Sequence, residues 1–490
     1  MHKKNKRNSL SKNMAIALVS FFVLLTSSVM TRPTYHAQFD WLFDQESLIA
    51  EEDRITDDDL QALKDVYNSI QVNYIEEVEK TDLLTGALKG MVDAIGDPYS
   101  EYLDAEESTS FEEDFQDSFE GIGVQFMMEN GRVTVISPID GTPAGEAGIL
   151  PNDIILEADG EDLTDMNTNE VVKLIRGPKD SEVTLLIQRN NSTFEVVLTR
   201  ATIPNITVTG EIDVNEASIG HIKISQFADN TYNELVDIVH DLRNQGATSL
   251  VFDLRMNPGG LLDSALDIGN MFLEDGEMIM QISERSSDEN AEFVANERAY
   301  GSFKITEPYT MLIDEGSASA SEILAAAVQE NTDAKLIGQT SFGKGTVQTI
   351  LNQSDIGELK LTSAKWLTPS GNWIHDVGIE PDMLVEDSPV ASSLLMNSNE
   401  TLELGVSNEF VESLALMLNA LGYEVSSESY FDEEVENAVK AFQVDNELEA
   451  DGKVTGETAH TLNRLIREYL KENDPQYDAA IKLLVEASND

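Results

Sequence analysis

Residues 309–331 read YTMLIDEGSASASEILAAAVQEN, and they join a strand to a helix through a turn of small residues. The first six residues, 309–314, are apolar enough for a buried strand, and the alanine-rich segment 321–331 is typical of a helix. The turn GSASASE (316–322) lies between them. A turn of this kind can expose one side chain together with the free backbone N–H groups that begin a helix.

Strand and helix signals alternate over residues 203–385, on both sides of this turn. Residues 219–227 and 249–255 are apolar, β-branched runs that predict strands, and residues 233–245 have the spacing of a helix. A further helix follows the glycine pair Gly259–Gly260. Alternation of this kind predicts an α/β core in which helices flank a central sheet.

Ser319 is the candidate nucleophile in the turn. The free N–H groups and the dipole of the following helix favour negative charge that develops on a substrate oxygen. The alternative is structural, because Ser319 and Glu322 have the spacing of a helix capping box. The turn alone leaves both interpretations open.

Lys344 lies between two glycines in SFGKGTVQ (341–348). A lysine can act as a general base only when it is neutral, so burial must lower its pKa from the ordinary value of about 10.4. Gln348 can orient such an amine through a neutral amide, whereas a carboxylate would keep the amine protonated. Residues four apart along a flat strand are separated by roughly 13 Å. Direct contact therefore requires a turn or bulge, which Gly345 permits.

A nucleotide-binding loop is the competing interpretation of this segment. Gly338, Gly343 and Lys344 have the spacing of a phosphate-binding loop, which then requires Ser or Thr. Gly345 occupies that position, and the following TVQTI is typical of a strand rather than of the helix that such a loop begins. We therefore exclude a nucleotide-binding site here.

Several motifs together carry a family resemblance. The segments GSASASEI and FGKGTVQ place Ser319 and Lys344 25 residues apart. They occur together with DLRMNPGG (253–260) and TPSGNWIHDVGIEPD (368–382). From about residue 55 to residue 387, the chain resembles the carboxy-terminal processing proteases, also called tail-specific proteases.

The resemblance implies a serine-type endopeptidase that needs no metal and no cofactor. It also implies a protease core of the ClpP/crotonase-like type. The oxyanion hole would consist of the backbone N–H groups of Ala320 and of Gly259 or Gly260. A glycine pair lets a backbone approach a substrate closely, which agrees with this role. The implied catalytic triad consists of Ser319, Lys344 and Gln348.

A compact, β-rich domain is predicted at residues 118–202, with one clear helix near residues 169–176. This region, including TPAGEAGILPNDIILEADG (142–160), resembles a PDZ domain. In PDZ domains, backbone N–H groups hold a chain terminus while the peptide adds as a strand to the sheet edge. Arg176, at the turn after the helix, is a candidate regulatory contact between domains. The candidate carboxylate-binding loop consists of Gly121, Ile122, Gly123 and Val124.

The N-terminal segment predicts export. Residues 14–30, MAIALVSFFVLLTSSVM, follow five basic residues and carry no charge. Their length is borderline between a signal peptide and a membrane-spanning helix. We expect an uncleaved single-pass anchor, with a cleaved signal peptide as the alternative. The basic flank predicts that everything after residue 37 lies outside the cytoplasm.

Farther on, Leu60, Leu63 and Val66 share one face of a predicted helix.

A second resemblance lies near the C-terminus. Residues 408–466 resemble a peptidoglycan-binding module. The resemblance is carried by LNALGYEV (418–425), FDEEVENAVKAFQ (431–443) and DGKVTGETAHTL (451–462). Peptidoglycan is therefore an expected ligand, and docking to protein is the alternative. A last amphipathic helix is predicted at residues 475–487.

Composition excludes several classes of function. The chain has 490 residues, a formal net charge of −58, no cysteine and six histidines. Disulfides and cysteine zinc sites are excluded, and no histidine pair has the HExxH spacing of a metal site. Such acidity repels nucleic acid and anionic lipid, so we expect no nucleic-acid partner. Adaptation to salty surroundings and an acidic surface without a specific partner explain the charge equally well.

The sequence thus predicts a multidomain α+β protein that acts outside the cytoplasm as an endopeptidase. Its PDZ domain would recognise protein substrates through their C-termini. The alternative is a catalytically idle scaffold of PDZ and wall-binding modules. The family analogy also allows a homodimer through the N- and C-terminal helices. The expected boundaries are 1–37 for the anchor or signal peptide, 45–117 for an N-terminal helical segment, 118–202 for the PDZ domain, 203–387 for the protease core, 388–401 for a linker, 402–468 for a three-helix peptidoglycan-binding-like domain and 469–490 for a helical tail.

Overall fold

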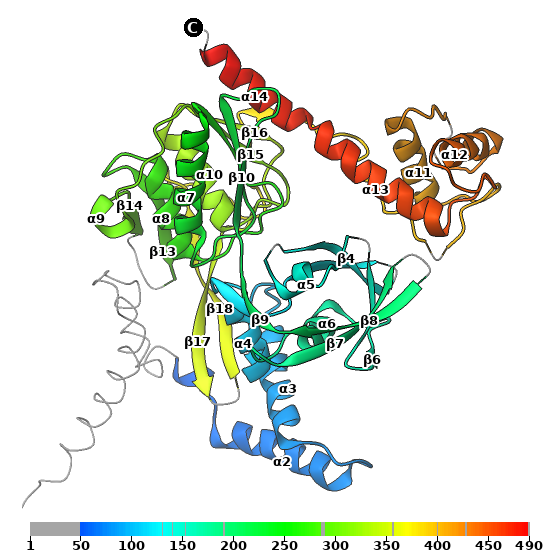
Figure 1. Cartoon of the computed structure of the whole chain (residues 1–490). Coiled ribbons are helices and arrows are strands. Elements are labelled where there is room, and N and C mark those ends of the chain that lie inside the picture. Colours follow the sequence, from blue (N-terminus) through cyan, green and yellow to red (C-terminus); the bar gives the residue numbers. More distant parts are fainter. Residues whose placement is uncertain are drawn as a thin grey trace, which may run out of the picture. The chain divides into compact units, whose positions relative to one another are not determined.

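The computed structural model divides the chain into two units, residues 1–83 and 84–490 (Figure 1). The predicted anchor or signal peptide at residues 1–37 lies outside the described residues. Within the described residues, no helix is long and apolar enough to cross a membrane. The structure describes residues 50–129, 131–139, 141–151, 153–189, 192–285, 290–354, 357–398, 400–426 and 429–488.

The first unit contains a 3-10 turn, η3 (Glu51–Asp53), the helix α2 (Asp57–Asn73) and the beginning of α3 (Lys80–Asp93). Thr56 caps α2 through a capping box with Asp59. The predicted apolar face of this helix forms, but its side chains at Leu60, Leu63 and Val66 are exposed.

The PDZ-like region is a six-stranded antiparallel sheet with β3 at one edge, in the order β3-β4-β5-β7-β8, and β6 pairs with β5 off this path. Side chains of alternating positions on β7, such as Val183, Leu185 and Ile187, are fully buried beneath α6 and α5. The elements are β3 (Val124–Glu129), β4 (Arg132–Pro138), α5 (Pro143–Glu146), β5 (Ile154–Ala158), β6 (Glu161–Asp162), α6 (Thr168–Ile175), β7 (Glu182–Arg189) and β8 (Ser192–Thr199). They are flanked by α4 (Ala105–Glu113) and by the paired strands β2 (Ser118–Gly121) and β9 (Ala201–Pro204).

The protease core contains the predicted α/β sheet, in the order β10-β11-β12-β15-β16-β19. Every neighbouring pair is parallel except β10 and β11. The strands are β10 (Val208–Ile212), β11 (Ile219–Ile224), β12 (Ser249–Asp253), β15 (Tyr309–Ile313), β16 (Lys335–Gly338) and β19 (Met383–Leu384). The helices are α7 (Thr231–Gln245), α8 (Leu262–Phe272), α9 (Glu297–Tyr300) and α10 (Ala320–Asn331).

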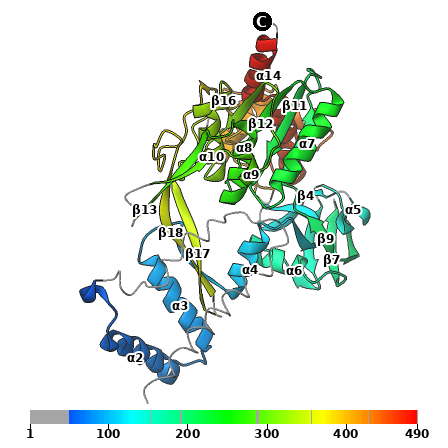
Figure 2. The ribbon, with the colours of Figure 1, turned by 90° about the vertical axis from the view of Figure 1, so that its left-hand side faces the viewer.

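Helices cover both faces of this sheet (Figures 1 and 2). Phe252 of β12 contacts Phe272 of α8, with ring centroids 4.8 Å apart. Its neighbour Val251 packs with Ala480 and Leu484 of the C-terminal helix α14 (Pro475–Ser488). Because successive side chains of a strand point to opposite faces, α8 and α14 lie on opposite sides of the sheet.

A second, antiparallel sheet carries a long hairpin, β17–β18, which begins directly after the predicted lysine loop. Its strands are β1 (Glu101–Asp104), β13 (Met278–Glu284), β14 (Ala291–Val294), β17 (Thr346–Ser354) and β18 (Gly357–Leu367). The hairpin therefore places residues 341–345 at the junction between the two sheets, because β16 of the first sheet ends at Gly338.

The C-terminal domain has the three predicted helices, α11 (Glu409–Ala420), α12 (Glu433–Asp445) and α13 (Gly456–Glu472). Its own core includes Leu414, Val435, Phe442 and Leu462. The multidomain α+β class predicted from the sequence is confirmed.

Candidate active site

Ser319 has a strained backbone at the N-terminus of α10. Its φ of 54° and ψ of −111° lie in a region that non-glycine residues rarely adopt. The side chain is half-buried. Ser319 and Glu322 form the predicted capping box, in which Glu322 accepts a hydrogen bond from the Ser319 backbone N–H at 2.8 Å.

The two neighbouring serines anchor this turn. Ser317 Oγ donates to the carbonyl of Leu254 at 2.8 Å, and Ser321 Oγ donates to the carbonyl of Asn257 at 2.9 Å. Both side chains are fully buried. The alternating serines of GSASASE thus fix the turn, on both sides of Ser319, to the segment after β12.

The glycine pair lies against the Ser319 turn. A Cβ atom at Gly259, whose φ is 103°, would come within 2.8 Å of the Ala320 nitrogen and 2.9 Å of the Ser319 Cβ. The N–H of Gly259 donates to Asn257 Oδ1 at 2.9 Å. The N–H groups of Gly260 and Ala320 have no acceptor within the described part of the chain. Of the pair, Gly260 is therefore the one with an N–H available for an oxyanion.

Glu322 connects the serine turn to the lysine loop. Its Oε2 accepts from the backbone N–H groups of Ser319 and Lys344, each at 2.8 Å. Its Oε1 accepts from Ser341 Oγ at 2.6 Å and from the Gly343 N–H at 2.7 Å. Because one oxygen accepts from both backbones, the nitrogens of Ser319 and Lys344 can be no farther apart than twice 2.8 Å. The structure thus brings the two predicted segments together.

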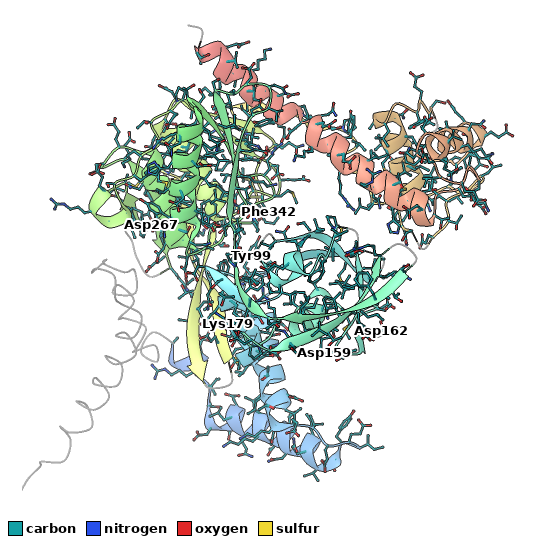
Figure 3. All side chains as sticks on the ribbon, viewed as in Figure 1. Tyr99, Asp159, Asp162, Lys179, Asp267 and Phe342 are labelled. Atoms are coloured by element: carbon teal, nitrogen blue, oxygen red, sulfur yellow. The ribbon has the colours of Figure 1, made fainter. Side chains whose placement is uncertain are left out.

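Lys344 is half-buried, and its amine faces an aromatic ring. Burial lowers the pKa of Lys344, the charge of Lys360 lowers it further, and the charges of Glu322 and Asp97 raise it. Its Nζ lies 5.0 Å from the ring centroid of Tyr99, which is labelled in Figure 3. The net direction is the one that a general base needs, because it favours the neutral amine.

Gln348 lies beyond a strand irregularity. The register of β17 and β18 shifts between Val347 and Gln348, within the segment where direct contact of Lys344 with Gln348 would need a turn or bulge. However, the Gln348 amide donates to Thr346 Oγ1 at 3.0 Å and to Thr362 Oγ1 at 3.3 Å. Within the described residues, no hydrogen bond joins the side chains of the three predicted triad residues to one another. The segments meet, and the side chains remain apart.

The PDZ-like loop borders a small pocket of about 100 Å³, next to the free edge of β3. The backbone N–H groups of Ile122 and Gly123 have no acceptor within the described part of the chain. Gly123 has a φ of 75°, and a Cβ there would lie 2.3 Å from Thr142 Oγ1. Only glycine fits this position. The pocket is lined by residues 121–124 together with Val172, Ile175, Arg176 and two phenylalanines.

Arg176 also lines this pocket. Its Nη1 lies 3.2 Å from Glu113 Oε2 of α4, and its guanidinium lies 4.5 Å from the ring centroid of Phe119. The side chain thus joins the end of α6 to a helix that precedes the PDZ-like sheet. The regulatory role of Arg176 stays a prediction.

Several contacts were not predicted from the sequence. Examples are the hydrogen bonds from residues 341–344 to Glu322 and the position of the Tyr99 ring beside the Lys344 amine. The indole N–H groups of Trp366 and Trp373 donate to the carbonyls of Lys344 and Gly345, each at 2.7 Å. No short-range signal connects these residues, because 22 and 28 positions separate the partners.

Comparison with protein-family models identifies four regions. Residues 218–385 match peptidase family S41, and residues 28–107 match the N-terminal domain of the activating protease CtpB. Residues 134–189 match the PDZ domain, and residues 407–462 match a putative peptidoglycan binding domain. The predicted resemblances are confirmed.

Whole proteins match over most of the chain. The chain is 37% identical over 466 residues to the carboxy-terminal processing protease CtpA of Bacillus subtilis (strain 168), covering 95% of this chain and 97% of that protein. It is 37% identical over 443 residues to CtpB of the same organism, covering 89% and 91%. A solved structure, the photosystem II D1 C-terminal processing protease, matches with 24% identity and a TM-score of 0.41 over 67% of this chain and 92% of that chain. The chain therefore belongs to the carboxy-terminal processing proteases of peptidase family S41, as a serine-type peptidase with a PDZ domain.

Proposed function

We propose that this protein is an extracytoplasmic endopeptidase in which Ser319 is the nucleophile and Lys344 is the general base. One observation carries the proposal. A strained serine at a helix N-terminus lies beside a half-buried lysine whose pKa is lowered by burial. The available N–H groups of Ala320 and Gly260 support an oxyanion hole at the same place.

In the proposed reaction, neutral Lys344 takes the proton of the Ser319 hydroxyl while the oxygen bonds to the substrate carbonyl carbon. The carbonyl oxygen becomes an oxyanion, which accepts hydrogen bonds from Ala320 and Gly260. Protonated Lys344 then gives its proton to the leaving amine as the peptide bond breaks, and water hydrolyses the acyl-enzyme. Gln348 orients the lysine once its amide oxygen accepts a hydrogen bond from the amine, which leaves the nitrogen lone pair for the proton of Ser319. The Lys344 amine would reach Ser319, and the Gln348 amide would reach the amine, by side-chain rotation. The backbones need not move, because those of Ser319 and Lys344 already meet at Glu322.

Substrates would bind by their C-termini at the PDZ domain. The N–H groups of Ile122 and Gly123 supply donors for a carboxylate, and the free edge of β3 can pair with an extended peptide. Gly121 and Val124 complete this loop. Arg176 borders the same pocket and contacts α4, which supports a role in signalling occupancy to the rest of the protein.

A cell-envelope location is supported by the peptidoglycan-binding domain and by the CtpA relative. We propose that residues 14–30 anchor the protein in the membrane and that its C-terminal domain binds peptidoglycan. We also propose that the protein forms a homodimer. The exposed apolar face of α2 is one surface through which two copies could pair.

The test is cleavage of an unfolded protein with a free C-terminus by wild type, Ser319→Ala and Lys344→Ala. Both variants should lose activity by about 10³-fold or more, because a triad acts as a unit. Ser392→Ala and Lys335→Ala, at exposed positions, are the matched controls and should cleave as wild type does. Full activity of either active-site variant would refute the mechanism. An inactive wild type that still bound peptides would favour the idle scaffold.

Recognition of C-termini has its own test. A peptide that ends in a free carboxylate should bind more tightly than the same peptide ending in an amide, because the amide lacks the charge that the loop attracts. Equal affinities in a fluorescence-anisotropy titration would contradict carboxylate recognition without affecting the proposed triad.

A further inference from the structure

Glu322 is a buried carboxylate whose hydrogen-bond donors are all uncharged. Its side chain is fully buried, and it accepts four hydrogen bonds, from three backbone N–H groups and one hydroxyl. Within the described residues, no lysine, arginine or histidine lies at ion-pair distance from it. A buried charge without a cation is costly to retain. The contacts that Glu322 makes to the serine turn and to the lysine loop must therefore outweigh this cost.

Other capping boxes in the chain show what an ordinary helix cap needs. Asp59 and Glu170 each accept from the backbone of their own N-cap residue, Thr56 and Asn167, and both carboxylates are exposed. Glu322 does the same for Ser319 but also binds three donors from residues 341–344. Capping of α10 therefore explains one of its four hydrogen bonds.

We infer that Glu322 is a positioning residue that holds the backbones of Ser319 and Lys344 in one fixed register. This inference rests on the proposed function of those two residues. Four donors on two oxygens satisfy an ionised carboxylate, which has no hydrogen to place among them. The lysine loop is fixed from its other side by the indole N–H groups of Trp366 and Trp373. Only the side chain of Lys344 is then left to move.

The carboxylate also acts on the proposed base through its charge. Within the described residues, four groups act on the Lys344 amine, namely the ring of Tyr99 and the charges of Glu322, Asp97 and Lys360. Burial and Lys360 lower the pKa of Lys344, whereas Glu322 and Asp97 raise it. Removal of the Glu322 charge should therefore lower this pKa. Activity that requires the neutral amine would then persist to lower pH.

Glu322→Gln separates these contributions. An amide has one acceptor oxygen and an NH₂ group, so one side of the side chain would point donors at the donors of Ser341 and Gly343, or at those of Ser319 and Lys344. We expect kcat to fall by about 100-fold, as for small misplacements of catalytic groups, with KM changed only a few-fold. The acid limb of the kcat profile should move to lower pH. Glu322→Asp, which keeps the charge but shortens the reach, should lower kcat without that movement.

The control is Asp59→Asn, the same carboxylate-to-amide change in an exposed capping box, which should leave kcat and its pH profile unchanged. Wild-type kcat in Glu322→Gln, with Ser319→Ala and Lys344→Ala inactive in the same assay, overturns this inference and leaves the proposed function standing. A lower kcat with an unmoved acid limb also overturns it, because loss of packing alone gives that result. Activity in Ser319→Ala or Lys344→Ala instead refutes the proposed function.

A second variant decides the case if Glu322→Gln does not fold, as judged by its near-ultraviolet circular dichroism. Ser341→Ala removes one donor from Glu322 Oε1 and keeps the charge. It should lower kcat by roughly tenfold, the effect of one lost hydrogen bond to a charged group. An unchanged kcat in this variant overturns the inference.

Discussion

Glu322 and Asp253 are both buried carboxylates of the protease core, but they are held by different kinds of partner. Asp253 accepts from Arg255 Nη2 at 2.7 Å and lies 3.3 Å from His221 Nε2. Glu322 accepts only from uncharged donors of the two proposed catalytic segments. A charge next to a cation is compensated where it lies. A charge held by dipoles still acts on its surroundings, and here the charge of Glu322 raises the pKa of Lys344.

The two pKa values move in opposite directions for this reason. Burial alone would raise the pKa of Asp253, but the hydrogen bonds from His221 and Arg255 outweigh it and hold the pKa well below its usual range. Burial also raises the pKa of Glu322, and the hydrogen bonds from Ser341 and three backbone N–H groups only reduce that rise. The ion pairs of Asp253 therefore stabilise the fold, whereas the charge of Glu322 still acts on Lys344.

The Asp253 site joins the core to the C-terminal tail. Arg255 also donates to both carboxylate oxygens of Asp474, at 2.9 and 2.7 Å, and to Gln476 Oε1 at 3.0 Å. Asp474 lies between α13 and α14, so this cluster connects the end of β12 to the segment that follows the peptidoglycan-binding-like domain. The glycine pair of the proposed oxyanion hole begins only four residues after Arg255.

Arg255→Ala should give the largest loss of stability. Among the described residues, the substitution leaves Asp253 with the backbone N–H of residue 255 and with His221 as its one side-chain partner, and it leaves Asp474 without its guanidinium. Removal of one partner of a buried ion pair typically costs about 3–5 kcal/mol. The free energy of unfolding from urea titration, followed by tryptophan fluorescence, measures this loss.

The matched control is Arg464→Ala. Arg464 pairs with Glu468 across one helical turn at 2.9 Å, and the two side chains are 44% and 57% exposed. Its loss should cost no more than about 0.5 kcal/mol. Equal effects of the two substitutions would show that the Asp253 cluster contributes no more than a surface pair.

The pH dependence of stability should distinguish the two carboxylates. Asp253, with a lowered folded-state pKa, contributes stability that is present above its unfolded pKa of about 3.9 and is lost as pH falls through the folded value. Glu322, with a raised folded-state pKa, has the opposite sign. Its contribution is fully present below an unfolded pKa of about 4.3 and declines as pH rises through the folded value.

Asp253→Asn should therefore flatten the loss of stability below pH ~4, an effect on the order of 2 kcal/mol. Glu322→Gln should instead flatten the decline above that pH. Urea titrations of wild type and both variants between pH ~3 and ~8 measure the slopes, which do not depend on the constant cost of each substitution. Parallel curves for all three proteins would remove the distinction between the two sites.

Much of the fold could be predicted because its signals are local. The strand, turn and helix of residues 309–331 follow from apolar runs and small residues, and β15 and α10 form there. The docking of α14 on the sheet could not be predicted. An amphipathic pattern shows that residues 475–487 need an apolar partner, but it does not identify β12 and β15 as that partner.

The candidate site was predictable as a set of segments and not as a set of contacts. The spacing of Ser319 and Glu322 indicated a capping box, and this capping box forms. The hydrogen bonds from residues 341–344 to Glu322 cross 19 to 22 positions, so periodicity cannot reveal them. Direct contact of Lys344 with Gln348 needed a turn or bulge, and the strand register does shift before Gln348. The Gln348 amide nevertheless binds two threonines, which no spacing rule indicates.

Tyr99→Leu should give the smallest effect of these substitutions. It tests whether the Tyr99 ring, like the charge of Glu322, raises the pKa of Lys344. The ring face favours the charged amine by about 0.5–1 kcal/mol at an accessible site, whereas leucine offers similar burial without that attraction. The pKa of Lys344 should then fall, and the acid limb of kcat should move to lower pH by less than about one unit. Tyr99→Phe keeps the ring and should leave the limb in place.

Since Glu322 also raises this pKa, the combination Tyr99→Leu with Glu322→Gln should move the limb farther than either change alone. A limb that moved to higher pH in Tyr99→Leu would show that the ring lowers the pKa by excluding water, and Glu322 and Asp97 would then be the only groups of the four that favour the charged amine.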